Sequence, residues 1–179
     1  MIAIDTQILV YAHRRESAWH DRARDRIREL AASSVPWAIP MHCLTEFYAQ
    51  VTQPSRFRPP STAAQAIAQI EGWLAAPRVS VLDESTRTWH VLRDLLRAAR
   101  ITGARAHDAR IAAVCIQHGV SELWTNDRDF LAFPALRVRN PLVDIQPSGA
   151  AEPAAKYRTA RAMRGRRGRV QPRRRSPRQ

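Results

Sequence analysis

The carboxylates best placed for chemistry are spread over four separate segments of the chain. They are Asp5 after the apolar run MIAI, Glu46 in LTEFYA, Asp108 in HDARIAA, and Asp127 with its weaker neighbour Asp129 in TNDRDF. Carboxylates that gather in one place repel one another, so either some hold a proton or a cation neutralises them. Mg²⁺ prefers oxygen ligands and takes one or two carboxylates with waters and phosphate oxygens. Such a site could bind a phosphodiester and activate a water molecule for in-line attack.

Each of these acids also has a structural explanation. Asp5, Asp108 and Asp127 all stand where a helix is expected to begin, and Asp is a favoured helix cap. Glu46 lies on a polar helical stripe that could be a solvated face. Helix caps that arise independently need not lie at the same edge of a sheet, however. We expect these acids to lie at one edge, which favours a functional role for them.

Short apolar segments alternate with longer amphipathic segments and position these acids. We expect strands at Met1–Ile4, Pro36–Ile39, Val79–Leu82, Glu122–Trp124 and Leu136–Val138. Helical patterns fill the intervals, and Gly119 is expected to cap the one over residues 107–118. This alternation predicts an α/β fold of three layers, α/β/α, with a central five-stranded parallel sheet. In such sheets, function lies at the carboxyl ends of the strands.

The positive charge of the chain is concentrated at its end. Of the formal net charge of +13, residues 150–179 carry +10 and residues 1–149 only +3. We therefore expect a folded domain over residues 1–147 and a disordered Arg/Pro-rich basic tail over residues 148–179. The tail could strengthen RNA binding nonspecifically through counterion release, or be an appendage without a selected role.

Several other classes of site are absent from the sequence. It has no GxxxxGK[ST] loop, GxGxxG turn, HExxH pair or GxSxG elbow, and no apolar run approaches the roughly 18 residues of a membrane span. The acid at residue 5 argues against a secretory signal. Cys43 and Cys115 lack metal-type spacing and are expected to be reduced, which favours a cytoplasmic location without membrane association.

Candidate RNA contacts lie in a loop and beside the acidic segments. The loop residues Arg56, Phe57 and Arg58 offer two charges around a ring that could stack on a base, although Phe57 could instead be tucked into the body. Arg110 and Arg128 flank the acids and could meet phosphates or pair with the acids themselves. His107 adjoins Asp108 and could enter the cleft, or have a solvated or capping role.

Four segments resemble the acidic motifs of PIN-domain nucleases, and most nearly those of VapC toxins. These are Ile4–Ala12 (IDTQILVYA), the Glu46 helix, His107–Ala113 (HDARIAA) and Thr125–Phe130 (TNDRDF), in matching order and spacing between Met1 and about Val143. The resemblance implies a PIN-type sheet and Mg²⁺- or Mn²⁺-dependent endoribonuclease activity. It also implies a cognate VapB-like antitoxin, as in type II toxin–antitoxin pairs, and a homodimer.

The resemblance also assigns roles to individual residues. Asp5 and Asp108 match the principal metal ligands. Glu46 and Asp127 match the acids that complete the site or orient the attacking water, and Asp129 is a secondary candidate in the same motif. Two positions depart from the usual pattern: Gln7 stands where the family usually has Asn, and Asn126 where Thr or Ser is common. Both can still hydrogen-bond and are secondary candidates.

Two other functions remain open from the sequence. A PIN-like protein could bind RNA without cleaving it if the longer Gln7 disturbs the acidic cluster. A phosphatase of another α/β family could also place a carboxylate after its first strand, but the haloacid-dehalogenase pattern would need a second Asp at position 7, where Gln7 stands.

Overall fold

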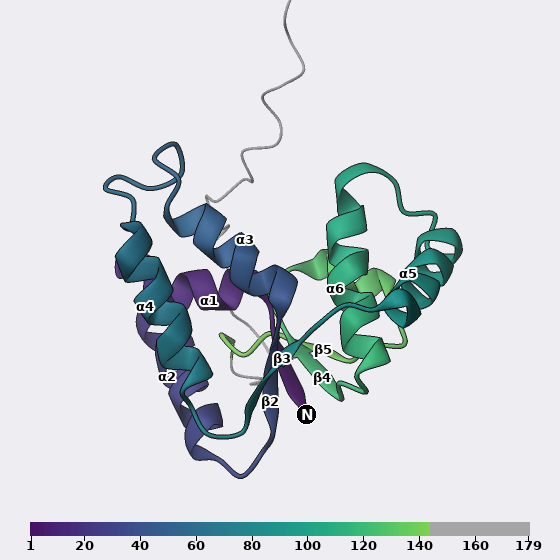
Figure 1. Cartoon of the computed structure of the whole chain (residues 1–179), viewed down its shortest axis with the longest axis horizontal. Helices are drawn as coiled ribbons and strands as arrows, with labels where there is room; N and C mark the ends of the chain where they lie inside the picture. Colours follow the sequence, from purple (N-terminus) through teal and green to yellow (C-terminus); the bar gives the residue numbers. More distant parts are fainter. Residues whose placement is uncertain (144–179) are drawn as a thin grey trace, which may run out of the picture. The chain divides into compact units, whose positions relative to one another are not determined.

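Five parallel strands form the centre of the computed structural model, which describes residues 1–143 (Figure 1). Their order across the sheet is β3-β2-β1-β4-β5. The strands are β1 (Ile2–Ile4), β2 (Trp37–Pro40), β3 (Val79–Leu82), β4 (Glu122–Trp124) and β5 (Val138–Arg139). The predicted five-stranded parallel sheet is confirmed. The expected basic tail, residues 148–179, and the boundary near residue 147 lie outside the described residues.

The last strand begins two residues later than the sequence pattern predicted. Leu136 is buried, but its N–H bonds to the carbonyl of Phe133 at 2.9 Å and therefore closes a turn. Val138 is the first residue to pair with β4, opposite Leu123. Burial of Leu136 in the core produced an apolar signal that resembled a strand.

Over residues 1–143, six helices cover the two faces of the sheet. In Figure 1 they lie in two groups, one on each side of the sheet. The first group is α1 (Thr6–His13), α2 (His20–Ala32), α3 (Met41–Val51) and α4 (Ala63–Leu74). The second is α5 (Thr86–Ala98) and α6 (Ala106–Gln117), with the short 3-10 helices η1 (Gly103–Arg105) and η2 (Arg128–Ala132) in the adjoining loops. The predicted α/β/α arrangement is confirmed.

The strand order changes direction between β1 and β4. The chain first steps from β1 outward to β2 and β3, then returns to place β4 on the other side of β1. In open parallel sheets a crevice forms at the carboxyl ends of the two strands where the order reverses. Here those ends are held together by the N–H of Asp5, which donates to the carbonyl of Trp124 at 3.0 Å. The strand topology therefore directs attention to the residues that follow Ile4 and Trp124.

The central strands are buried on both faces, which explains their continuous apolar sequences. Ile4, Trp37 and Leu123 are fully buried. The helix α1, which follows β1, is also buried along most of its length. Cys43 and Cys115 are both buried free thiols. Within residues 1–143, no helix has the length and hydrophobicity needed to cross a membrane.

Gly119 ends α6 and turns the chain into β4, as the sequence predicted. Its φ of +66° is in the left-handed region. The N–H of Gly119 bonds to the carbonyl of Ile116 at 3.1 Å, and the N–H of Val120 bonds to Cys115 at 2.9 Å, the hydrogen-bond pair of a Schellman cap. This cap sets where β4 starts, and hence where the residues after Trp124 lie.

The cap leads to a prediction for a matched pair of substitutions. A Cβ added at either Gly119 or Gly72 would meet no atom within 4 Å, so only backbone conformation distinguishes the two positions. Gly119→Ala should lower the free energy of unfolding by about 1–2 kcal/mol because L-residues disfavour positive φ. Gly72→Ala, inside α4, should raise it by about 0.5–1 kcal/mol. Urea unfolding followed by circular dichroism would measure both, and destabilisation of equal size would contradict the assignment.

Candidate active site

Asp5 is the buried carboxylate directly after β1, where the strand order reverses. It caps α1, and one of its oxygens, Oδ1, accepts the N–H of Thr6 at 2.8 Å. The other oxygen, Oδ2, accepts the hydroxyl of Thr125 at 2.7 Å. Thr125 directly follows β4, so this bond joins the ends of the two strands at the reversal. Asp5 is therefore both a helix cap, as one interpretation of the sequence held, and part of a site between β1 and β4.

The carboxyl of Asp5 is difficult to ionise in the absence of a cation. Burial is the main cause, and Glu46 and Asp127 add negative potential, while the bonds from Thr125 and Thr6 oppose the shift. Together these raise the pKa of Asp5 to about 7. A buried carboxylate without a basic partner is the electrostatic condition that a bound cation relieves.

Glu46 faces Asp5 from the neighbouring helix α3 and is half-buried, so it does not lie on a solvated stripe. Its Oε2 accepts the hydroxyl of Thr6 at 2.8 Å, and its Oε1 accepts the side-chain amide of Gln50 at 3.0 Å. Thr6 thus contacts both carboxylates, through its N–H to Asp5 and its hydroxyl to Glu46. The two acids are held on adjacent elements by one threonine.

Asp127 and Asp129 approach from the loop after β4. The N–H of Asp127 donates to the hydroxyl oxygen of Thr125 at 3.0 Å. Its own carboxylate caps η2 by accepting the N–H of Asp129 at 2.8 Å. Arg105 lies 3.9 Å from a carboxylate oxygen of Asp129, which is an exposed ion pair. Asp127 therefore also combines a capping role with a position beside Asp5.

Asp108 completes the group from the first turn of α6. Burial raises its pKa to about 6, with further contributions from the negative charges of Asp127, Asp129 and Glu46. The charge of Arg105 opposes the shift only weakly. All five acids singled out in the sequence thus lie close enough at the carboxyl edge of the sheet to influence one another electrostatically.

The donor set fits a hard divalent cation that keeps part of its hydration shell. Within residues 1–143, no three His, Cys, Asp or Glu side chains form a ready-made metal cage. Mg²⁺ needs only one or two protein carboxylates when waters and phosphate oxygens fill its other positions. Asp5 and Asp108, whose pKa values are both raised, have carboxylate oxygens of the kind that such an ion binds. The residues therefore fit the cation that the motifs imply.

The two departures from the family pattern have different surroundings. The side-chain amide of Asn126 donates to the hydroxyl of Tyr11 at 3.2 Å, which links the loop after β4 to α1. Gln7 is half-buried in the first turn of α1, and in the described part of the chain its amide makes no hydrogen bond to a carboxylate. Asn126 therefore helps to hold the loop after β4 against α1. Gln7 donates no hydrogen bond to the carboxylates in the described residues.

The basic candidates are distributed over different parts of the surface. Arg56 lies near the cluster, since the charge of Glu46 acts on it, and burial lowers its pKa. Arg110 instead pairs with Glu84 and donates to Nδ1 of His42 at 3.1 Å. The other two are Arg58, exposed on the far side of α1, and Arg128, which opens η2 beside the acids.

Phe57 is tucked into the body, which is the alternative that the sequence left open. Its ring is 9% exposed and is covered by the guanidinium of Arg14 at 4.3 Å from the ring centroid. Arg14 is itself anchored by the hydroxyl of Ser61 at 3.0 Å and the carbonyl of Pro59 at 2.9 Å. In this conformation the ring is not available to stack on a base.

Sequence reasoning missed the residues that hold the acids in place. Thr6 and Thr125 both lie inside the quoted motifs, beside Asp5 and Asp127, and that adjacency was the available signal. The stacked pair of His42 and His107 was not anticipated, because the two residues are far apart in sequence. Burial and the nearby charge of Arg110 lower the pKa of His42.

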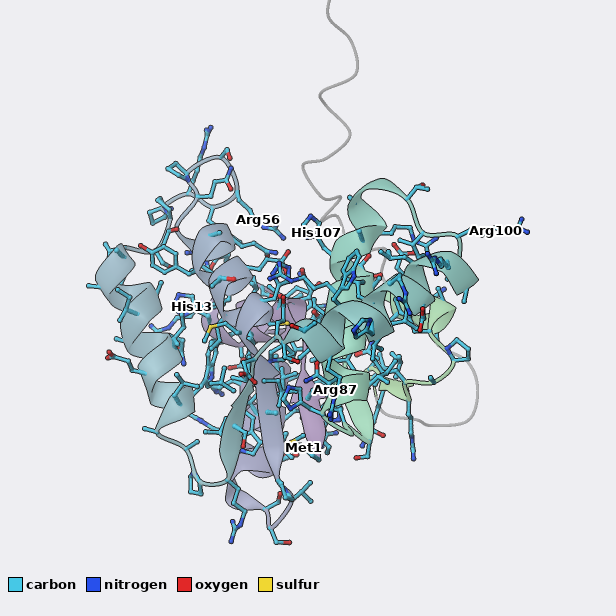
Figure 2. The ribbon with its side chains drawn as sticks, turned by 45° about the vertical axis from the view of Figure 1, so that its right-hand side comes forward. Met1, His13, Arg56, Arg87, Arg100 and His107 are labelled. Carbon is cyan, nitrogen blue, oxygen red and sulfur yellow. The ribbon has the colours of Figure 1, made fainter. Side chains whose placement is uncertain are left out.

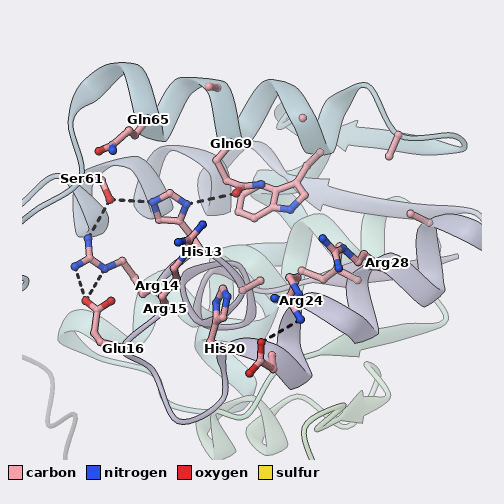
Figure 3. A pocket seen from close by; sticks show the side chains of 18 of the residues that line it. His13, Arg14, Arg15, Glu16, His20, Arg24, Arg28, Ser61, Gln65 and Gln69 are labelled. Atoms are coloured by element: carbon pink, nitrogen blue, oxygen red, sulfur yellow. Dashed lines mark hydrogen bonds and ion pairs between the residues drawn. The ribbon is translucent and has the colours of Figure 1, made fainter.

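A separate groove of about 1410 Å³ opens at the other end of α1, between α2 and α4 (Figure 3). Its floor includes Ile27, Trp37 and Trp73. Five arginines line it: Arg14, Arg15, Arg24, Arg28 and Arg58. The eight residues of α1 separate it from Asp5 by about 12 Å. The groove is therefore distinct from the carboxylate site.

Comparison with known proteins agrees with this geometry. The PIN domain family model matches residues 2–136. Ribonuclease VapC43 of Mycobacterium tuberculosis is 32% identical over 142 residues, covering 79% of this chain and 96% of the relative. Ribonuclease VapC48 of the same organism is 28% identical over 141 residues, covering 76% and 94% respectively.

Solved structures show the same fold at lower sequence identity. VapBC2 from Rickettsia felis, bound to a promoter DNA fragment, gives a TM-score of 0.60 at 23% identity, covering 78% of this chain and 98% of that one. VapC20 of Mycobacterium tuberculosis, described as a Sarcin-Ricin loop cleaving toxin, gives 0.57 at 21% identity, covering 78% and 100%. With the family model and the identity to VapC43, these findings show that the chain belongs to the PIN domain family, among the VapC ribonucleases.

Proposed function

We propose that this protein is a divalent-metal-dependent endoribonuclease and the toxin of a type II toxin–antitoxin pair. The observation that carries the proposal is the buried carboxyl of Asp5, joined to Thr125 at the strand reversal and surrounded by other acids. The family relationship supports RNA as the substrate. A protein that only bound RNA would not need several carboxyl groups buried close together, an arrangement that is unfavourable when they ionise.

Asp5 and Asp108 are the proposed ligands of Mg²⁺ or Mn²⁺, because burial and neighbouring acids raise the pKa of both carboxyls. When bound, the ion would polarise the phosphodiester and neutralise charge that develops in the transition state. Glu46 and Asp127 complete the site or orient the attacking water. Thr6 and Thr125 hold these acids in place, and Asp129 is a secondary contributor at the exposed rim.

Arg56 is the best-placed candidate for a phosphate contact. The electrostatic influence of Glu46 on Arg56 indicates that its charge lies close enough to attract RNA to the carboxylates. Arg128 is a second candidate because it adjoins Asp127 and Asp129. Arg110 is already engaged by Glu84, and Arg58 points to the groove, so both are weaker candidates.

The groove at the other end of α1 is the proposed docking surface for a VapB-like antitoxin. Its apolar floor and arginine-rich lining suit an amphipathic segment that carries acidic residues. Arg15, Arg28 and Arg58 are exposed and could meet such acids directly. A homodimer of the toxin remains a prediction from the family resemblance.

The proposal predicts metal-dependent cleavage that depends on two carboxylates. Purified protein incubated with total RNA should produce discrete fragments with Mg²⁺ or Mn²⁺ and none with EDTA. Asp5→Asn and Asp108→Asn should each reduce the cleavage rate by at least about 100-fold, because each removes a ligand charge without changing side-chain volume.

Asp25→Asn is the matched control, since Asp25 is an exposed carboxylate on α2 that pairs with Arg24 and Arg28. It should cleave at the wild-type rate. RNA binding without cleavage by wild-type protein in either metal would instead favour an RNA-binding function, and reverting Gln7→Asn would then be the next variant to examine.

The carboxyl groups also predict how stability depends on pH and on metal. Because the folded-state pKa values of Asp5 and Asp108 are raised above 3.8, the metal-free folded state holds more protons than the unfolded state between about pH 4 and pH 7. Its stability should therefore fall as pH rises through that window, by roughly 4 kcal/mol for Asp5 alone.

Mn²⁺ should reverse this trend, because it binds the deprotonated acids and its stabilising effect should be larger at about pH 8 than at about pH 5. Asp5→Asn should flatten the metal-free pH profile and remove most of the Mn²⁺ effect. Thermal unfolding with and without Mn²⁺ measures both, and a metal-free stability that rises between these pH values would contradict the assigned shifts.

A further inference from the structure

We propose that His107, backed by His42, is the surface on which a nucleobase beside the cleaved phosphodiester stacks. The two imidazoles are parallel within 3°, and their centroids lie 5.6 Å apart. His42 is half-buried, whereas His107 is exposed. The pair therefore presents a flat aromatic surface to solvent with a second ring behind it. This inference rests on the proposed RNA cleavage and adds a base-contacting residue to it.

The inner ring is fixed by its surroundings. Arg110 donates to Nδ1 of His42 at 3.1 Å, and since arginine cannot accept, this nitrogen is the unprotonated one. Arg110 is in turn held by an ion pair with Glu84. A ring fixed in this way provides support for the outer one, so that less conformational freedom is lost when a base stacks on His107.

The two histidines lie next to carboxylates on two different helices. His107 directly precedes Asp108 in α6, and His42 lies one helical turn before Glu46 in α3. Figure 2 labels Arg56, from the loop after α3, and His107, from the first turn of α6, close together in the upper half of the view. A nucleotide whose phosphate meets the acids and Arg56 would therefore have its base within reach of His107.

A purely structural role does not explain an exposed histidine at this position. The contact joins α3 and α6, but the exposed ring of His107 buries little apolar surface and has no hydrogen bond within residues 1–143. Unpaired RNA bases commonly stack on aromatic side chains, His included, whereas the faces of a paired base are covered by its neighbours. The expected ligand is therefore an unpaired base.

The test measures base stacking separately from cleavage. Short unstructured RNAs carrying one 2-aminopurine at successive positions would be titrated with protein in EDTA, where cleavage is absent. One position should be quenched on binding to wild-type protein. His107→Ala should lose that quenching and bind between about 5-fold and about 150-fold more weakly. His107→Phe, which keeps a flat ring without ring nitrogens, should restore both.

His90→Ala is the control, since His90 is an exposed histidine on α5 and its replacement should change neither signal. With Mn²⁺ present, His107→Ala should raise the KM for cleavage more than it lowers kcat. Unchanged quenching and affinity in His107→Ala, or failure of His107→Phe to restore them, would overturn the stacking role. If Asp5→Asn still abolished cleavage in that case, the proposed nuclease function would stand.

Discussion

The burial of one carboxyl group, Asp5, at the end of β1 is the constraint on which the rest of the site depends. A buried acid without a basic partner is unfavourable when ionised, and its pKa of about 7 reflects that cost. Two threonines satisfy its oxygens, but neither carries a charge that could neutralise it. The fold therefore keeps a buried acidic site whose charge the proposed cation would neutralise.

The sheet topology explains why this acid can be surrounded by others. Because the strand order reverses beside β1, the loops after β1 and β4 and the start of α6 all meet at one edge. Thr6 links Asp5 to Glu46 on α3, and Thr125 links Asp5 to the loop that holds Asp127. Asp5, Glu46 and Asp127 thus belong to one network of hydrogen bonds, which holds these three acids in place before any substrate binds.

Sequence patterns predicted the sheet, the helices, the Gly119 cap and the gathering of the acids, because each depends on local residue type or on a general property of parallel sheets. They did not predict contacts between distant residues. The bond from Thr125 to Asp5 spans 120 positions, and the His42–His107 stack joins two helices. The sequence also left the burial of Phe57 open, because its cover is Arg14 from another segment.

In the proposed site, Asp5 and Asp108 together bind the divalent ion that cleavage needs. The most direct measurement is the anomalous scattering of Mn²⁺ in crystals of the protein, compared with crystals of Asp5→Asn. We predict one strong peak in contact with the carboxylates of Asp5 and Asp108 that is absent from the variant. Mn²⁺ bound only at other acids, in protein that still cleaves RNA, would contradict this assignment.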